Sequence, residues 1–376
     1  MRSYKYLIVG GGMTGDSACR GIRDHDADGS IGLVGVEGHP PYSRPPLSKA
    51  LWQGKDESSI WRGTEELGVD LTLGRRIVSL DLDAHRAADD QGEEYEYERL
   101  LLATGGKPRR LDGADAIYFR TFDDYRRLRE AAADGVNVLV VGGGFIGSEI
   151  AAALQSNGAQ VTMVFPEDGI GARLFPAGLA SFVTGYYREQ GVDVRTGELA
   201  SPELLAGAGL VVAGLGIVPD TELAASAGLQ VDDGILVDDR GRAGRDDVFA
   251  AGDVARFPIP ALGTTTRVEH EDHANTHGRV VGANMAGADT PYDHLPFFYS
   301  DLFDLGYEAV GEVDSRHETV EHWKEPGREG VVAYVDANRK PRGFLLWNVW
   351  GKVDAARELI TAAQAIDEDR VRELAG

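Results

Sequence analysis

Three glycines near the N-terminus have the spacing of a phosphate-binding turn. An apolar run at residues 6–9 leads into them, and they are Gly10, Gly12 and Gly15. A helix-compatible stretch follows, then a second apolar run at residues 31–36 that ends at Glu37. Glycines at this spacing allow a tight turn and a close approach to a pyrophosphate, while the acid binds ribose hydroxyls. The pattern predicts a strand-helix-strand unit that binds a dinucleotide.

The same arrangement recurs in the middle of the chain. After an apolar run at residues 136–141 the glycines are Gly142, Gly144 and Gly147. Residues 148–155 favour a helix, residues 161–165 favour a strand, and Glu167 follows. Two complete units predict two dinucleotide sites. One would hold FAD and the other a nicotinamide, which together perform hydride transfer while the protein supplies orientation and electrostatics.

Two further runs end in small-residue turns that could let backbone approach a cofactor. They are residues 100–106 and residues 248–253. Asp253 closes the second turn, where it is either an acceptor for a ribityl hydroxyl or a helix cap. Beyond about residue 290, two apolar runs at 331–335 and 344–349 flank a polar turn, which is typical of a hairpin. Residues 352–360 then favour an amphipathic helix.

We therefore expect an α/β protein with two Rossmann-like dinucleotide-binding domains and a C-terminal α+β domain. The predicted FAD-binding domain is discontinuous and comprises residues 1–112 and 245–290. Residues 113–244 form the predicted NAD(P)H-binding domain, and residues 291–376 the C-terminal domain.

The composition is that of an ordinary globular protein, with 43% hydrophobic and 26% charged residues among 376. We find no run resembling a membrane span or a secretory signal, so we expect a cytoplasmic protein. The net charge of −23 disfavours nucleic acid and anionic lipid as partners. We interpret this acidic charge as that of an ordinary acidic protein rather than as an adaptation to high salt. The single cysteine, Cys19, excludes a disulfide or a dithiol relay within the chain.

Four motifs resemble those of FAD-dependent pyridine nucleotide oxidoreductases, in the ferredoxin-reductase-like branch that includes apoptosis-inducing factor. PYSRPPLSK at residues 41–49 is similar to a segment of that branch. GGGFIGSE at 142–149, VFPE at 164–167 and RVEHEDH at 267–273 are most similar to apoptosis-inducing factor. The resemblance extends from the first strand to about Gly311.

The resemblance implies a role for each matching residue. It places Lys49 beside the flavin ring in a pair with Glu149, which suits both ionised groups, although a lysine after a proline-rich turn is otherwise simply solvated. It also places His270 near the flavin and makes Phe145 a shield that moves aside for nicotinamide. The FAD contacts it implies are Gly10, Gly12, Gly15, Glu37, Arg44, Lys49, Ile77, Ala103, Thr104, Gly105, Arg120, Gly252, Asp253, Glu269, His270 and Tyr299.

The implied nicotinamide contacts include Glu167, whose charge disfavours a 2′-phosphate and so favours NADH. Arg173 could still reach a phosphate, so NADPH stays open. Tyr299 replaces the tryptophan that is usual in the family, which changes the packing expected against the flavin. The nicotinamide contacts are Gly142, Gly144, Phe145, Ile146, Glu149, Glu167 and Gly216.

The histidines at positions 270, 273 and 277 invite a metal-binding interpretation, but the ligand set is weak and we expect no metal. Cys19 is expected to be a small core residue. Arg75-Arg76 and residues 107–110 are candidate basic clusters for docking an acidic redoxin.

Three functions remain open at this point. The first resembles apoptosis-inducing factor: NADH reduces the flavin, a long-lived flavin–NAD charge-transfer complex forms, and electrons pass to oxygen, a quinone or a redoxin. The second is a ferredoxin or rubredoxin reductase of an electron-transfer chain. The third is a non-catalytic interaction module. We favour the first, an NADH oxidoreductase, with a homodimer as a possible assembly.

Overall fold

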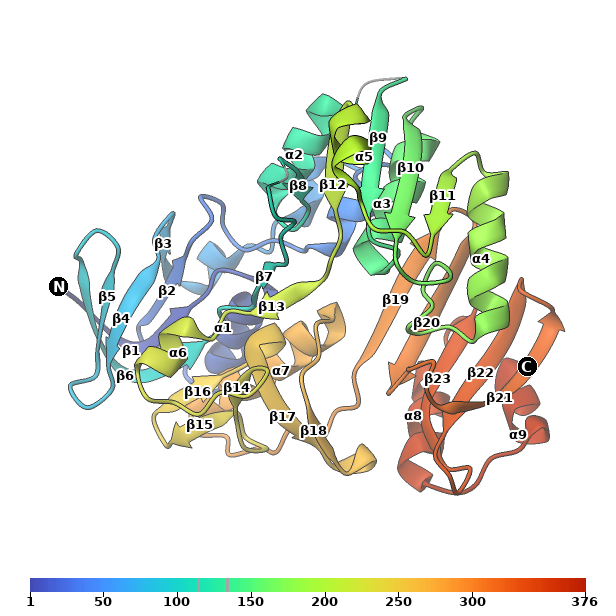
Figure 1. Ribbon diagram of the computed structural model, residues 1–376. Helices are drawn as coiled ribbons and strands as arrows, with labels where there is room; N and C mark the ends of the chain where they lie inside the picture. The colour runs from blue at the N-terminus through green and yellow to red at the C-terminus, as the bar shows by residue number, and fades with distance from the viewer. Residues whose placement is uncertain (114, 133–134) are drawn as a thin grey trace. The chain divides into compact units, whose positions relative to one another are not determined.

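The computed structural model describes residues 1–113, 115–132 and 135–376. The chain forms two compact units and passes between them five times. Unit 1 contains residues 1–44, 58–107 and 218–296, and unit 2 contains residues 45–57, 108–217 and 297–376. Figure 1 shows the labelled helices and strands.

Unit 1 is built on an eight-stranded sheet with the strand order β15-β16-β6-β1-β2-β3, which β4 and β5 extend through β6. The central strands β6, β1 and β2 are parallel. Strand β2 and the C-terminal parts of β1 and β6, residues 6–9 and 100–102, are apolar and buried, as expected of a sheet covered on both faces. The strands are β1 (Arg2–Val9), β2 (Ile31–Gly35), β3 (Val69–Leu73), β4 (Ile77–Asp81), β5 (Arg86–Asp89), β6 (Glu94–Leu102), β15 (Arg242–Arg245) and β16 (Val248–Ala250).

The helices of unit 1 are α1 (Met13–His25), α6 (Glu222–Ser226) and α7 (Glu271–Met285). A smaller sheet is formed by β14 (Ile235–Leu236), β17 (Ala255–Ile259) and β18 (Thr264–Thr266), and β7 (Gly106–Pro108) pairs with β13 (Ile217–Pro219). Short 3-10 turns are η2 (Glu57–Ile60), η3 (Thr64–Leu67), η4 (Gly252–Val254) and η5 (Pro260–Leu262).

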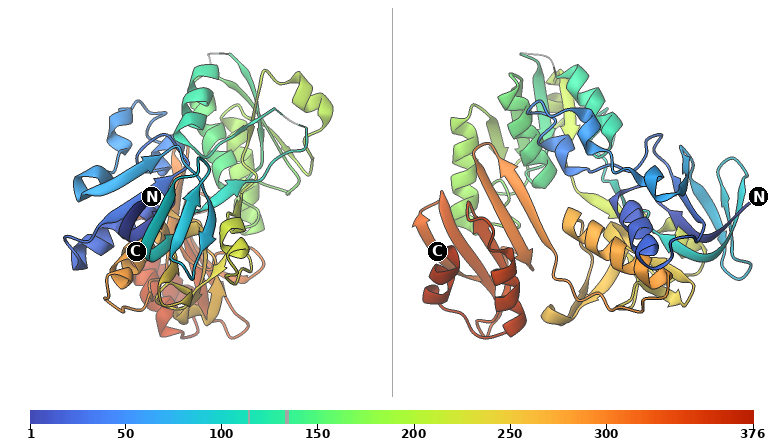
Figure 2. Two further views of the ribbon diagram at one scale, coloured as in Figure 1. Left: turned by 90° about the vertical axis from the view of Figure 1, so that its left-hand side faces the viewer. Right: turned by 180° about the vertical axis from the view of Figure 1, so that it is seen from behind.

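Helices α1 and α7 lie side by side at backbone distance (Figure 2). A Cβ on Gly21 would lie 2.0 Å from the carbonyl oxygen of Arg279, and one on Gly282 would lie 2.1 Å from that of Ala18. Glycine is therefore required at both positions, because any side chain would force the helices apart.

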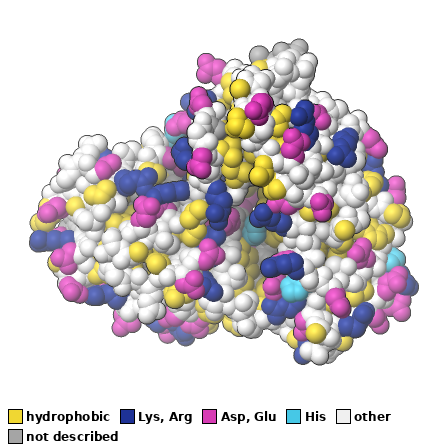
Figure 3. Space-filling model, in the orientation of Figure 1, with side chains coloured by type: hydrophobic (Ala, Val, Ile, Leu, Met, Phe, Trp, Pro, Cys, Tyr) yellow, Lys and Arg dark blue, Asp and Glu magenta, His cyan; other side chains and the backbone are white. Residues whose placement is uncertain are grey.

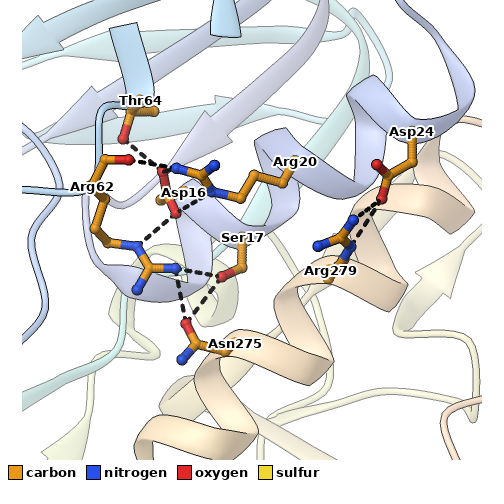
Figure 4. A network of polar contacts seen from close by, with 8 residues as sticks. All are labelled: Asp16, Ser17, Arg20, Asp24, Arg62, Thr64, Asn275 and Arg279. Carbon is orange, nitrogen blue, oxygen red and sulfur yellow. Dashed lines mark hydrogen bonds and ion pairs between the residues drawn. The ribbon is translucent and has the colours of Figure 1, made fainter. Parts of the chain in front are cut away.

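A buried charge network ties α1 to a distant loop and to α7 (Figure 4). The Asp16 carboxylate is fully buried and accepts hydrogen bonds from Arg20, Arg62 and Thr64. Arg62 continues to Ser17 and Asn275. Although burial opposes ionisation, the two arginines outweigh it and lower the pKa of Asp16.

We expect Asp16→Asn to lower the free energy of unfolding by about 3 kcal/mol, because it leaves two arginines facing a neutral group in a buried site. Denaturant titration followed by tryptophan fluorescence measures this change. The matched control is Asp24→Asn, which breaks the exposed Asp24–Arg279 pair on the same two helices. Its cost should stay below about 1 kcal/mol, and equal costs for both variants would contradict the prediction.

Unit 2 contains a parallel five-stranded sheet with the order β11-β10-β9-β12-β8. Its strands are β8 (Ile117–Tyr118), β9 (Asn137–Val141), β10 (Gln160–Phe165), β11 (Asp193–Thr196) and β12 (Leu210–Ala213). Its helices are α2 (Phe122–Ala131), α3 (Phe145–Ser156), α4 (Ala177–Glu189) and α5 (Pro202–Gly207), and the turn η1 (Pro45–Ser48) belongs to the same unit.

The C-terminal part of unit 2 is an antiparallel sheet with the order β19-β20-β23-β22-β21. The bounds are β19 (Phe297–Leu302), β20 (Leu305–Gly311), β21 (Glu318–Glu325), β22 (Glu329–Val335), β23 (Pro341–Trp347), α8 (Val353–Ala362) and α9 (Glu368–Ala375). Helix α8 packs on β20 and β23, and α9 packs on β21 and β22 (Figure 1). The predicted hairpin is thus β22–β23 and the predicted helix is α8.

The compact units divide the chain differently from the predicted domains. Residues 218–244, which the sequence places with the nicotinamide half, lie in unit 1, where β14 pairs with β17 and β15 with β16. The C-terminal sheet shares unit 2 with the second glycine turn. Aromatic contacts explain this sharing, because Phe175 packs edge-on against both Tyr307 and Trp347.

Candidate functional site

The first glycine turn has two tightly packed positions and one open one. A Cβ on Gly10 would lie 2.1 Å from the Ala103 carbonyl oxygen, and a Cβ on Gly15 would lie 2.2 Å from that of Gly10. At Gly12, by contrast, none of the described residues comes within 4 Å of the Cβ position. Because α1 starts directly after this glycine, the open position lies at a helix N-terminus, which suits an anionic pyrophosphate.

Glu37 lies two residues after β2, which ends at Gly35 rather than at residue 36, and its carboxylate is held from two sides. It accepts a hydrogen bond from the Tyr42 hydroxyl at 2.6 Å and from the Arg44 guanidinium at 2.7 Å. Tyr42 is also fixed by a β-bridge to Trp61. The structure thus brings two predicted FAD contacts, Glu37 and Arg44, to one place in unit 1.

The remaining predicted FAD contacts of unit 1 lie mainly on turns that end strands. Thr104 Oγ1 donates to the Asp220 carbonyl, and Gly105 has a positive φ of 65°. Ile77 differs from them, because its side chain is buried in the apolar core with Tyr95. The others in this unit are Ala103, Gly252, Asp253, Glu269 and His270.

The turn at Gly252 and Asp253 packs against α1 and α7. A Cβ on Gly252 would lie 2.1 Å from Thr14 Oγ1, and the Gly252 N–H donates to His277 Nδ1 at 3.3 Å. Arg267 donates to the Asp253 carbonyl and pairs with Glu269. Asp253 lies within η4 (Gly252–Val254), and that turn places it beside the helix of the first glycine turn.

The histidines on α7 are core residues. His273 and His277 are fully buried and pack with Phe257 and Tyr292. Burial lowers the pKa of His277 to about 3 and that of His273 well below its usual value. Among the described residues, no cluster of three or more His, Cys, Asp or Glu side chains could hold a metal ion.

These neutral histidines make stability depend on pH. A histidine with a lowered pKa in the folded state is fully stabilising above the unfolded value near 6.5, and that stability is lost as pH falls. For His277 the free energy of unfolding should drop by about 2 kcal/mol between pH 7.5 and pH 5. Denaturant titrations at the two pH values test this, and His277→Asn should flatten the dependence. An unchanged pH dependence of the unfolding free energy in His277→Asn would contradict the prediction.

The second glycine turn, in unit 2, repeats the pattern of the first. A Cβ on Gly142 would lie 2.4 Å from the Gly214 carbonyl oxygen, and one on Gly147 would lie 2.0 Å from that of Gly142. At Gly144 the described chain again leaves the Cβ position clear to 4 Å. The exposed Ile146 side chain and the half-buried Phe145 ring follow at the start of α3. Phe145 meets Phe298 edge-on at 5.1 Å.

The predicted Lys49–Glu149 pair exists and is buried. Lys49 Nζ lies 2.5 Å from Glu149 Oε1, with the two side chains 12% and 5% exposed. The same ammonium lies 5.3 Å above the Tyr299 ring. Sequence reasoning missed two of the carboxylate's partners, Ser48 and Ser300, which each donate a hydrogen bond at 2.6 Å. The sequence feature that could have identified Ser300 is a polar residue at a buried position of β19.

Other predicted residues of unit 2 lie apart from this pair. Glu167 follows β10 and pairs with Arg173 at 2.6 Å, so the arginine that could have bound a phosphate contacts the acid instead. Gly216 has a φ of 79° and its carbonyl accepts from the Arg109 N–H. Arg120 precedes the capping box of α2, where its N–H donates to Asp124.

Comparison with known proteins identifies the family to which this architecture belongs. The model of the pyridine nucleotide-disulphide oxidoreductase family matches residues 4–278. The chain belongs to this family. A model of the C-terminal region of apoptosis-inducing factor matches residues 281–329.

Individual members of the family match over nearly the full chain. A mitochondrial apoptosis-inducing factor 1 of Dictyostelium discoideum is 33% identical over 98% of this chain and 80% of its own length. The ferredoxin–NAD(+) reductase component of the anthranilate 1,2-dioxygenase system of Burkholderia cepacia is 31% identical, covering 99% and 97%. Putidaredoxin reductase, in its covalent complex with putidaredoxin, has a TM-score of 0.89 at 28% identity, covering 100% of this chain and 96% of that one.

The oxidoreductase is FAD-dependent and uses a pyridine nucleotide. Its own residues fit both groups, since each glycine turn leaves one position open at a helix N-terminus. The disulphide chemistry in the family's name does not apply, because Cys19 is the single cysteine and is fully buried. Burial raises the pKa of its thiol, which makes it a poor nucleophile.

Proposed function

We propose that the protein is an NADH-dependent flavoprotein that passes electrons to an external acceptor. The observation that carries this proposal is the buried Lys49–Glu149 pair, whose lysine lies over the Tyr299 ring. A buried charge pair costs desolvation free energy, and a lysine held over an aromatic ring suits the stabilisation of charge on a flavin. When bound, FAD accepts a hydride from the nicotinamide and delivers electrons one or two at a time.

Each unit supplies a different part of the proposed chemistry. In unit 1, the open position at Gly12 receives the FAD pyrophosphate, and Glu37 with Arg44 binds its adenosine half. In unit 2, Gly144 receives the pyrophosphate of NADH and Glu167 its ribose, which disfavours NADPH because a 2′-phosphate would face a carboxylate. Lys49 places a fixed positive charge where negative charge develops on reduction, and Glu149 fixes the lysine.

The acceptor is a redoxin, a quinone or oxygen. Three of the five basic side chains in the clusters that would steer an acidic redoxin form ion pairs: Arg75 pairs with Asp89, and Arg76 and Lys107 both pair with Asp220. Figure 3 shows Lys and Arg side chains interspersed with Asp and Glu on the face drawn. These pairs favour the function typified by apoptosis-inducing factor over a ferredoxin reductase, although putidaredoxin reductase is a similar structure.

The proposal also includes a cytoplasmic location, which is expected from the sequence, and a homodimer, an assembly that the sequence leaves open. Within the described parts of the chain, no helix has the length and apolar character needed to span a bilayer.

Anaerobic titration of the holoprotein with NADH, and separately with NADPH, tests the proposal. We expect NADH to bleach the flavin at lower concentration than NADPH does. A broad long-wavelength band that survives admission of air would support the long-lived complex with NAD. Rapid reoxidation without that band would instead favour a turnover enzyme and direct attention to redoxins. A flavin that neither nucleotide bleaches would refute the proposed function.

A further inference from the structure

The Glu149 carboxylate accepts three hydrogen bonds from three side chains outside its own helix. Ser48 donates to Oε2, and Ser300 and Lys49 both donate to Oε1. Ser48 is 6% exposed and Ser300 is fully buried. Lys49 alone would donate to only one of the two carboxylate oxygens. The two serine hydroxyls supply the further hydrogen bonds that a buried carboxylate needs to stay ionised.

Ser300 lies directly opposite Tyr307 in the β19–β20 pair. A carboxylate can only accept, so the Ser300 proton points to Glu149. Burial, and then the charge of Glu149, raise the pKa of Tyr307 well above its usual value, so this phenol keeps its proton.

The strand residue opposite Ser300 belongs to the aromatic core. The Tyr307 ring stacks on Trp347 and meets Phe175 edge-on, and it is 2% exposed. Ser300 is therefore held in a closed part of the structure, where Glu149 is its side-chain acceptor.

We propose that Ser48 and Ser300 are positioning residues that hold the Glu149 carboxylate oriented, and through it hold Lys49 in place for flavin reduction. This inference rests on the proposed function of the same pair. It extends that function by naming residues that touch neither nucleotide and act only through Glu149.

The electrostatic surroundings define what each hydroxyl contributes. The ionisable groups near Glu149 are Lys49, Asp301, Tyr187 and Tyr307. Burial raises the pKa of Asp301, and the charge of Glu149 adds to this while Lys49 opposes it. Lys49 alone carries a compensating positive charge among these four groups. Removing a hydroxyl therefore makes the charged form of Glu149 less favourable.

The first test measures the carboxyl group itself, in the oxidised holoprotein without nicotinamide. Infrared difference spectra recorded against pH reveal the carbonyl stretch of the protonated acid, and Glu149→Gln identifies its band. In Ser300→Ala and in Ser48→Ala we expect the band to appear about one pH unit higher than in the wild type.

The second test measures the rate of flavin reduction by NADH in stopped flow across the same pH range. In the alanine variants the acid limb of the rate profile should move with the infrared band. At pH values below the shifted limb the reduction rate should fall about tenfold, and above it the rate should be near that of the wild type. Ser300→Thr retains the hydroxyl and should restore both readouts. Thr184→Ala is the matched control, since this equally buried hydroxyl bonds the backbone of Ile170 and Ala180. Thr184→Ala should shift neither the infrared band nor the acid limb of the rate profile.

The outcomes separate the two levels of inference. If NADH does not reduce the wild-type flavin, the proposed function fails. If it does, but the band and the acid limb stay in place in both alanine variants, the role of the serines is refuted. That role is also refuted if Ser300→Thr behaves like Ser300→Ala, or if Thr184→Ala shifts the band equally.

Discussion

Replacing Gly144 with valine should leave a folded, yellow protein that NADH no longer reduces at ordinary concentrations. Gly144 has φ −86° and ψ −164°, an extended conformation that valine adopts readily. The described residues of the protein leave 4 Å clear around the added Cβ. The added Cβ therefore starts from open space on the side where the pyrophosphate of NADH is proposed to bind, and we expect the KM for NADH to rise about 100-fold, equivalent to about 2.8 kcal/mol of binding.

The equivalent change in the other turn should give the opposite phenotype. Gly12 has φ −88° and ψ −172° and is equally open, so Gly12→Val should yield a folded but colourless protein. Absorbance, circular dichroism and NADH kinetics distinguish the two variants. Gly147→Ala serves as the steric control and should not fold, because its Cβ would lie 2.0 Å from a carbonyl oxygen. If Gly144→Val lost FAD and Gly12→Val kept it, the assignment of the two turns would be reversed.

Lys49→Met should slow flavin reduction by about 10²- to 10³-fold, the usual effect of removing one preorganised electrostatic group. The variant also leaves the Glu149 carboxylate buried with only hydroxyl partners, an arrangement that disfavours its charge. The double variant Lys49→Met/Glu149→Gln removes that uncompensated charge. If the positive charge is what matters, the double variant stays as slow as the single one.

Stopped-flow reduction by NADH provides the measurement, with FAD content checked by absorbance. Lys55→Met is the matched control, since Lys55 is an exposed lysine in the same segment, and its rate should equal that of the wild type. Recovery of the rate in the double variant would show that Lys49 only neutralises Glu149 and has no direct role.

The parts of the fold that the sequence predicted are those governed by local backbone constraints. Both glycine turns follow from a strand, a tight turn and a helix that are contiguous in the chain, and the β22–β23 hairpin follows from alternation around a turn. The placement of residues 218–244 could not be predicted in this way, because it depends on β14 pairing with β17, a strand that is not its neighbour in the chain.

The same distinction holds within the site. Lys49, Glu149 and Phe145 lie in recognisable motifs, so family resemblance located them. Ser300 lies 151 residues from Glu149, and its role depends on which face of β19 it occupies. The Asp16–Arg62 contact likewise joins a helix to a loop through a register that no local pattern encodes.

The packing of α1 against α7 has a consequence for how the protein is made. Residues 13–25 leave the ribosome well before their partner helix, which ends at residue 285. The face of α1 that packs on α7 must therefore stay uncovered while the residues between the two helices are synthesised. Since the chain crosses between the units five times, neither unit can be completed as a vectorial, N-terminal-first product, and exposed apolar surface of this kind is what chaperones bind. Yield in a recombinant host should accordingly be set by translation rate and chaperone supply.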